Sequence, residues 1–198
     1  MARTAGRPPR SKSEILEFQS KIGKHALEIY RAEGFGAVSM RRLANEVGCA
    51  PMTIYAHFEG KTDILRYLWA DVLAEISNEI ETTLNSVVGA RERLQSAAQT
   101  FLAYWIDHPD HFRLVFMSND VTRADVGKFV MDEDTLAHFR VFSGLIREVH
   151  PEGHGVKVSS DTLISGLIGI ALCMNTVADY PWANATSMTN QLLSSITA

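Results

Sequence analysis

Apolar residues recur every three or four positions along most of the chain, and no stretch alternates with period two for long enough to indicate a sheet. Steps of three and four place apolar side chains on one face of an α-helix. The longest example has Thr62 and Asp63 in its first turn and reaches Leu84. Its roughly 22 residues contain neither Gly nor Pro and predict a rod of roughly 33 Å. The pattern predicts an all-α fold.

The same steps, with Gly and Pro at the breaks, divide the chain into predicted helices. The segment from Met1 to about Lys12 has no periodicity and is expected to be a disordered basic tail. Ser39 is a predicted N-cap, and Pro51 suits the first turn of a helix. The expected helices span residues 13–33, 39–47, 51–58, 62–84, 90–108, 110–118, 132–149, 160–178 and 185–197.

Composition argues against several classes of protein. The chain has 198 residues, of which 46% are hydrophobic and 21% charged, as in ordinary globular proteins. The longest nearly apolar run, residues 163–174, is shorter than the roughly 20 residues that a membrane-spanning helix needs. Cys49 and Cys173 lie far apart, without metal-ligand spacing, which favours a reducing compartment. A cytoplasmic location is therefore expected, with no metal site.

Charge is distributed unevenly along the chain. Residues 1–70 carry eleven Lys and Arg against seven Asp and Glu, for a net charge of +4. Residues 71–198 carry eight against sixteen, for −8. This asymmetry indicates a small anion-binding module joined to a larger acidic body. A chance fluctuation in surface charge is the alternative.

Residues 39–58 form the most informative segment. Two short predicted helices separated by a glycine-containing turn, after a longer helix, make a helix-turn-helix unit. Ile54 and Phe58 share one face of the second short helix, which we expect to be buried, and Met52 and Ala56 point the opposite way. Small, apolar and hydroxyl-bearing side chains on that outer face suit the major groove of DNA. A three-helix cap that only covers a core is the alternative.

Residues 35–65, FGAVSMRRLANEVGCAPMTIYAHFEGKTDIL, closely resemble the DNA-binding signature of the tetracycline-repressor (TetR) family. The matching elements occur in the family's order: an aromatic after Gly34, Ser39, Leu43-Ala44, Val47-Gly48, Thr53-Ile54-Tyr55, His57-Phe58 and Lys61. The motif covers residues 13–65, and the rest of the chain resembles the family in helix number and length. The resemblance implies a DNA-binding domain at 13–60 and a helical ligand-binding and dimerisation domain at 61–198.

The resemblance also implies individual roles on DNA. Phosphate-clamping positions of the family are matched by Tyr55, His57 and Lys61, and base-facing positions by Pro51, Met52 and Ala56, with Thr53 beside them. Ser39 begins a helix whose N-terminus favours an anion, and Arg41 and Arg42 follow it. Many members have Lys or Arg where this chain has Pro51. Sequence reading is therefore expected to use methyl contacts, Arg41 or Arg42, or the basic tail with Arg3, Arg7 and Arg10.

Aromatic residues in the helical body form a candidate ligand site. A pocket lined by aromatic side chains with a few histidines suits a flat or apolar small molecule. The resemblance implies an effector cavity in this region. The candidate lining residues are Tyr104, Trp105, His108, Phe112, Phe116, Phe139 and Phe142. Ordinary core packing of these residues is the alternative.

The predicted helix at 160–178 is apolar on nearly all sides. Such a helix must be buried on all sides, and a second copy of the chain is a simple partner. Glycines permit close approach of two backbones. The candidate dimerisation residues are Leu163, Gly166, Leu167, Gly169, Ile170 and Met174. A central helix inside a monomer is the alternative.

These features together predict a homodimeric, ligand-responsive transcriptional repressor that binds a near-palindromic operator in double-stranded DNA. The sequence contains no Gly-rich phosphate loop, no G-x-S-x-G elbow and no H-E-x-x-H motif, so neither enzyme activity nor a cofactor is expected. Two other classes stay open. One is a non-specific architectural DNA binder, and the other is a helical carrier or enzyme with an incidental helix-turn-helix.

Overall fold

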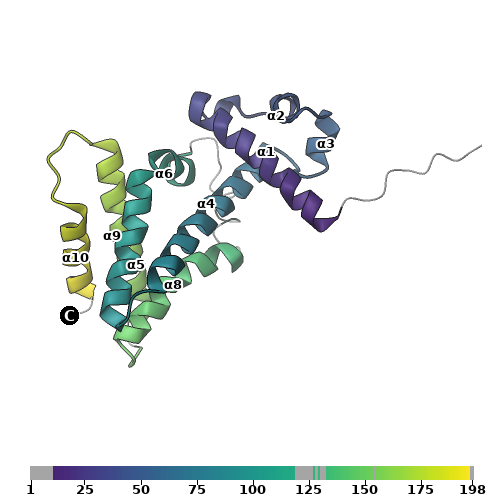
Figure 1. Cartoon of the computed structure of the whole chain (residues 1–198). Coiled ribbons are helices and arrows are strands. Elements are labelled where there is room, and N and C mark those ends of the chain that lie inside the picture. Colours follow the sequence, from purple (N-terminus) through teal and green to yellow (C-terminus); the bar gives the residue numbers. More distant parts are fainter. Residues whose placement is uncertain (1–10, 119–126, 128, 130–132, 154, 197–198) are drawn as a thin grey trace, which may run out of the picture. The chain divides into compact units, whose positions relative to one another are not determined.

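A computed structural model of the chain describes residues 11–118, 127, 129, 133–153 and 155–196. The expected basic tail with Arg3, Arg7 and Arg10 lies outside them. The described residues form helices and connecting turns and contain no strand, so the all-α prediction is confirmed (Figure 1). The elements are α1 (Lys12–Glu33), the 3₁₀ turn η1 (Phe35–Ala37), α2 (Met40–Val47), α3 (Pro51–Tyr55), α4 (Lys61–Leu84), α5 (Ala90–Asp107), α6 (Pro109–Phe116), α8 (Glu133–Val149), α9 (Val156–Thr176) and α10 (Ala185–Ile196).

Several helix boundaries differ from the sequence prediction by a few residues. Ser11 caps α1 in a capping box with Glu14, so the helix already includes Lys12, which the sequence had assigned to the tail. Helix α3 ends at Tyr55, two or three residues before the predicted end. Helix α9 begins at Val156, four residues early, after Gly155 in the left-handed conformation.

The chain forms two compact units that meet in sequence between Leu68 and Trp69, within α4. In the first unit, α2 packs against α1 and α3. Its apolar core takes side chains from every helix of the unit: Ile22, Ala26, Ile29, Leu43, Ala44, Val47, Ile54, Phe58, Ile64, Leu65 and Leu68. Helices as short as α2 and α3 are stable only through such packing.

In the second unit, α5, α8 and α9 pack against one another, and α10 packs against α5 and α9 (Figure 1). The largest side chains of this core come from α5, α6 and α8, namely Trp105, Tyr104, Phe112 and Phe142. Trp69 of α4 donates its indole N–H to the backbone oxygen of Leu114 at 2.7 Å. The indole thereby anchors α4, at the first residue of the second unit, to α6.

Helix α9 is more apolar than its neighbours. By length and composition alone it could cross a membrane, because its 21 residues exceed the apolar run counted in the sequence. It packs against three helices of its own unit, yet only 28% of its most apolar stretch is buried within the chain. The helix therefore keeps apolar surface that its own chain does not cover.

Candidate nucleic-acid interface and ligand site

The turn between α2 and α3 is set by capping. Ser39 accepts a hydrogen bond from the backbone N–H of Arg42 at 3.2 Å and so begins α2, as predicted. Gly48 ends the helix with φ +77, in the left-handed region that favours glycine. Pro51 then occupies the first turn of α3. This order of residues produces two short helices joined by a tight turn.

Helix α3 has a buried face and an exposed face. Ile54 and Phe58 lie in the core, as the sequence predicted. On the opposite side Met52 is 76% exposed and Tyr55 51% exposed, and Pro51 and Ala56 are exposed as well. Exposed large apolar side chains that lie together are typical of binding surfaces. Thr53 is half-buried beside them.

The two other predicted phosphate ligands lie next to α3. The His57 ring contacts the Phe18 ring, with centroids 4.9 Å apart, and its backbone oxygen accepts a hydrogen bond from Gln19 at 3.5 Å. Lys61 is the first residue of α4, and its ammonium lies 4.2 Å from the centroid of the Phe35 ring. Cation and helix N-terminus together make this a favourable place for an anion.

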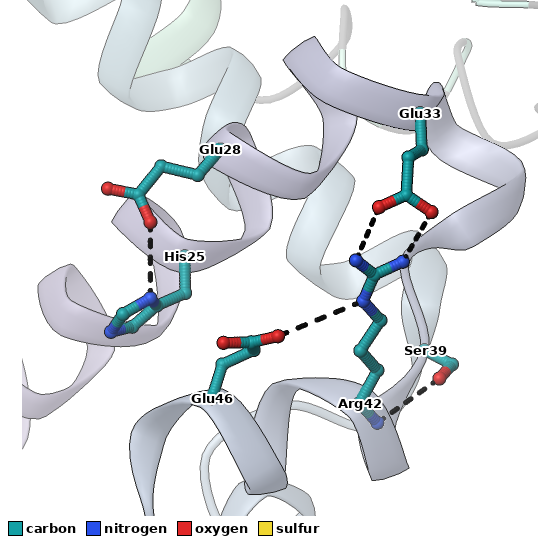
Figure 2. Close-up of polar contacts among 6 residues, drawn as sticks. All are labelled: His25, Glu28, Glu33, Ser39, Arg42 and Glu46. Carbon is teal, nitrogen blue, oxygen red and sulfur yellow. Dashed lines mark hydrogen bonds and ion pairs between the residues drawn. The ribbon is translucent and has the colours of Figure 1, made fainter.

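The two arginines of α2 differ in environment. Arg42 forms a forked pair with Glu33 at the end of α1, with N–O distances of 2.8 and 2.5 Å, and its Nε lies 4.0 Å from Glu46 (Figure 2). The hydrogen bond from Arg42 holds the pKa of Glu33 below its ordinary value. Arg41 is exposed and has no hydrogen bond or ion pair with the described part of the chain. Only Arg41 is thus free for an external anion.

Most of the predicted ligand residues come together in the second unit. Trp105 lies at the centre of a set of edge-to-face ring contacts, with centroid distances of 5.2 Å to Tyr104, 6.0 Å to Phe112 and 5.0 Å to Phe116. The His108 ring lies 4.6 Å from that of Tyr104. Phe142 joins through Phe101, which contacts both Phe142 and Trp105. Phe139 is half-buried and makes no ring contact with the described residues.

One polar group of this aromatic cluster, the Tyr104 hydroxyl, is hydrogen-bonded, and another, the Trp105 indole N–H, is not. The Tyr104 hydroxyl donates to Glu75 at 3.2 Å and lies 2.8 Å from Nδ1 of His111. Burial, with the nearby Glu75 carboxylate, strongly raises the pKa of Tyr104. The indole N–H of Trp105, by contrast, is buried and finds no hydrogen-bond acceptor within the described residues. A buried donor without an acceptor destabilises the fold.

The sequence did not assign Phe101, Glu75 or His111 to the cluster. Phe101 lies four residues before Trp105 on α5, a helical spacing that could have found it. Glu75 lies on α4, 29 residues before Tyr104, so no helical spacing could have predicted their contact. His111 stacks on His108, with centroids 5.3 Å apart, and no group of three metal-binding side chains exists among the residues described.

Two open hollows in this unit are not lined by the aromatic side chains of the cluster. One of about 280 Å³ lies between α4 and α8, where Ser77 Oγ is 2.6 Å from Nδ1 of His138. Another of about 210 Å³ lies between α5 and α10, beside Asn190. The aromatic side chains at the centre of the cluster are buried, so a ligand there needs the helices to part.

The candidate dimerisation residues of α9 point in different directions. Leu163 and Leu167 are fully buried in the chain's own core. Gly166 faces α10, since a Cβ atom there would lie 2.5 Å from Leu192. Gly169 has no neighbouring atom of the chain within 4 Å of such a Cβ, and Ile170 and Met174 are half-buried. On the outer side, Leu172 is 41% exposed, although it was not among the predicted dimerisation residues.

Comparisons with known proteins find similarity to bacterial transcriptional regulators. Residues 22–68 match the family described as bacterial regulatory proteins, tetR family. The chain is 23% identical over 148 residues to the HTH-type transcriptional activator FasR of Mycolicibacterium smegmatis, covering 74% of this chain and 65% of the relative. It is 30% identical over 106 residues to the HTH-type transcriptional repressor DrrR1 of Streptomyces coeruleorubidus, covering 54% of this chain and 38% of the relative. Both matches span less than two thirds of the relative's length.

The similarity in fold to solved structures extends over most of the chain. The crystal structure of the transcriptional regulator FadR from Bacillus subtilis, in complex with stearoyl-CoA, matches with a TM-score of 0.69 at 15% identity. The match covers 90% of this chain and 97% of that one. The helix-turn-helix signature, its family match and this shared all-helical architecture lead to one conclusion: residues 22–68 match the tetR family of bacterial regulatory proteins, and the chain as a whole has the fold of a solved transcriptional regulator.

Proposed function

We propose that this protein is a ligand-responsive transcriptional repressor that binds a near-palindromic operator as a homodimer in the cytoplasm. The observation that carries the proposal is the helix-turn-helix with its exposed face at Met52, Tyr55 and Ala56, inside the segment that matches the family. Residues 13–60 bind DNA, and residues 61–198 bind the effector and dimerise.

On DNA, phosphate contacts fix the position of the protein and base contacts select the sequence. Tyr55, His57 and Lys61 contact phosphates, together with the N-terminus of α2 at Ser39 and the side chain of Arg41. The base edges are read from α3 by Pro51, Met52, Thr53 and Ala56. Their methyl and thioether groups suit thymine methyl groups in the major groove.

A dimer places two α3 helices in successive major grooves, roughly 34–36 Å apart. We assign the interface to the outward side of α9, around Gly169 and Leu172, with α10 beside it. Support comes from the apolar surface that α9 leaves uncovered and from the open space over Gly169. Gly166 instead permits the close approach of α10 of the same chain.

The effector is a small apolar or aromatic molecule that binds among the rings around Trp105. The buried indole N–H supports a ligand with a hydrogen-bond acceptor, because such a ligand removes the cost of the unpaired donor. The stearoyl-CoA complex of the Bacillus subtilis FadR supports an apolar chain as one ligand class. Tyr104, His108, Phe112, Phe116, Phe139 and Phe142 are the remaining members of this proposed site.

The effector releases DNA only if it prefers the form that cannot bind the operator. In this proposal, effector binding moves α4, which contains Lys61 at its first position, and changes the spacing of the two recognition helices. The site must open to admit the ligand, and the opened form is the one that the ligand stabilises.

Selection of duplexes from a random DNA library by the full-length protein tests the proposal. We expect an inverted repeat bound at least about 1000-fold more tightly than random DNA. A ratio near one would indicate an architectural binder, and no DNA binding at all would mean that the helix-turn-helix is incidental. Thermal unfolding with stearoyl-CoA and a panel of flat aromatic acids then tests the effector site, with Trp105→Phe as the variant that removes the N–H donor and keeps an aromatic ring.

A further inference from the structure

Helix α2 is tied to α1 by a polar contact at each of its ends. In its first turn, the Arg42 guanidinium makes the forked pair with Glu33, the last residue of α1. At its other end, the Lys21 ammonium of α1 donates to the backbone oxygen of Val47 at 3.1 Å. Apolar packing between the two helices is not directional, whereas a forked guanidinium–carboxylate pair fixes geometry. The two ties therefore set how α2 is rotated on α1.

The contacts of Arg42 compete with a role in binding phosphate. Nη1 and Nη2 are bonded to Glu33, and Nε faces Glu46 at 4.0 Å, so two carboxylates surround one guanidinium (Figure 2). Its backbone N–H is also used, by the Ser39 cap. The hydrogen bond to Glu33 raises the pKa of Arg42, so the guanidinium stays charged and paired. This local arrangement has a net negative charge, which disfavours a phosphate.

We propose that Arg42 and Glu33 are positioning residues for the recognition helix, and that Arg42 does not contact DNA phosphate. The inference rests on the proposed DNA-binding function. Helix α3 follows α2 after the short turn at residues 48–50, and the two helices pack together. The orientation of α2 on α1 is thereby passed to Met52 and Ala56 on the exposed face of α3.

Glu33→Gln separates the two roles by the direction of its effect. The substitution removes a negative charge from the DNA-binding module, which on electrostatic grounds alone would tighten binding. If Glu33 positions α2, affinity for the selected duplex instead falls by about twofold to fivefold. Glu28→Gln is the matched control, since it removes the same charge from α1, where the partner is His25 of the same helix at 3.2 Å (Figure 2). Its affinity should equal or exceed that of the wild type.

Two Arg42 variants provide a second, independent measurement. Lysine keeps the charge but cannot form the forked pair. Arg42→Lys is expected to weaken binding to the selected duplex as much as Glu33→Gln does. Arg42→Ala should leave the slope of log K against log salt unchanged. If Arg42 bound a phosphate, Arg42→Ala would flatten that slope by roughly 1.8 in a dimer.

Fluorescence-anisotropy titrations of the full-length variants, at several salt concentrations, provide these values for the selected duplex and a random duplex. Circular dichroism identifies any variant that does not fold. Tighter binding by Glu33→Gln, or a flattened slope for Arg42→Ala, would overturn the inference. A third result would also overturn it: variants of Glu33 and Arg42 that melt at a lower temperature but bind the selected and the random duplex as tightly as the wild type. The pair would then stabilise the fold without affecting DNA binding. A wild type that selects no duplex would refute the proposed function instead.

Discussion

Tyr104 of α5 contacts two other helices through its hydroxyl group, which donates to Glu75 of α4 and contacts His111 of α6. Because the pKa of Tyr104 is raised, the folded protein keeps the phenol neutral where the unfolded chain ionises it. The unfolded state then binds fewer protons, so the contribution to stability is complete below about pH 10 and is lost as the pH rises further.

Tyr104→Phe is expected to lower the free energy of unfolding by about 1–2 kcal/mol near neutral pH, because it removes the hydroxyl from a buried position. Above about pH 10 the difference between wild type and variant should shrink, since only the wild type loses stability through this group. Urea unfolding at neutral and alkaline pH measures both quantities. A difference that stays constant across this range would mean that the phenol ionises equally in the two states.

Lys61 and Met52 differ in the kind of DNA contact that we assign to them. Lys61→Ala should weaken binding to operator and random DNA by similar factors and flatten the salt slope by roughly 1.8 in a dimer. Met52→Ala should leave the slope alone and relax preference at one base pair per half-site, by roughly 1–3 kcal/mol at most. Titrations on both duplexes at several salt concentrations distinguish the two. Altered specificity in Lys61→Ala at constant slope would contradict the assignment.

At the scale of elements, helix positions followed from apolar spacing and capping residues, but some ends did not. Helix α9 starts earlier than its apolar stripe because its first turn includes the exposed residues Lys157 and Val158. The η1 turn has no periodic pattern to reveal it. The Arg42–Glu33 pair joins different helices, and Glu75 lies 29 residues before Tyr104, so no local spacing could predict either contact. The aromatic residues of the cluster could be predicted from residue type. Its polar members, Glu75 and His111, could not, because tertiary packing brings them there.

Gly48 is the one position in the helix-turn-helix turn where backbone conformation dictates the residue. Gly48→Ala is expected to lower the free energy of unfolding by about 1–2 kcal/mol, because φ +77 is strained for any residue with a Cβ atom. Gly36→Ala is the matched control: neither glycine would place a Cβ within 4 Å of another residue, and Gly36 has no positive φ. Chemical denaturation should show a change of less than about 0.5 kcal/mol for the control. Equal effects would show that φ is not the cause.

At the scale of the whole molecule, the outward side of α9 is the surface on which the proposed dimer depends. Leu172→Glu is expected to raise the dimer dissociation constant by more than about tenfold, since each interface would bury two unpaired carboxylates. Val88→Glu, at a side chain that is 91% exposed between α4 and α5, provides the control for an added charge. Sedimentation velocity over a range of concentrations measures both. A Leu172→Glu protein that sediments as the wild-type dimer would place the interface elsewhere.

The exposed apolar side chains of Met52 and Ala56 also affect the heat of DNA binding. Burial of apolar surface lowers the heat capacity of a complex. An interface that reads bases through Met52 and Ala56, rather than through arginines, should bind its operator with an enthalpy that becomes more favourable as temperature rises. Random DNA, which is held by phosphate contacts alone, should show a much weaker temperature dependence. Calorimetry at several temperatures thus distinguishes sequence-specific binding through base contacts from non-specific binding through phosphate contacts alone.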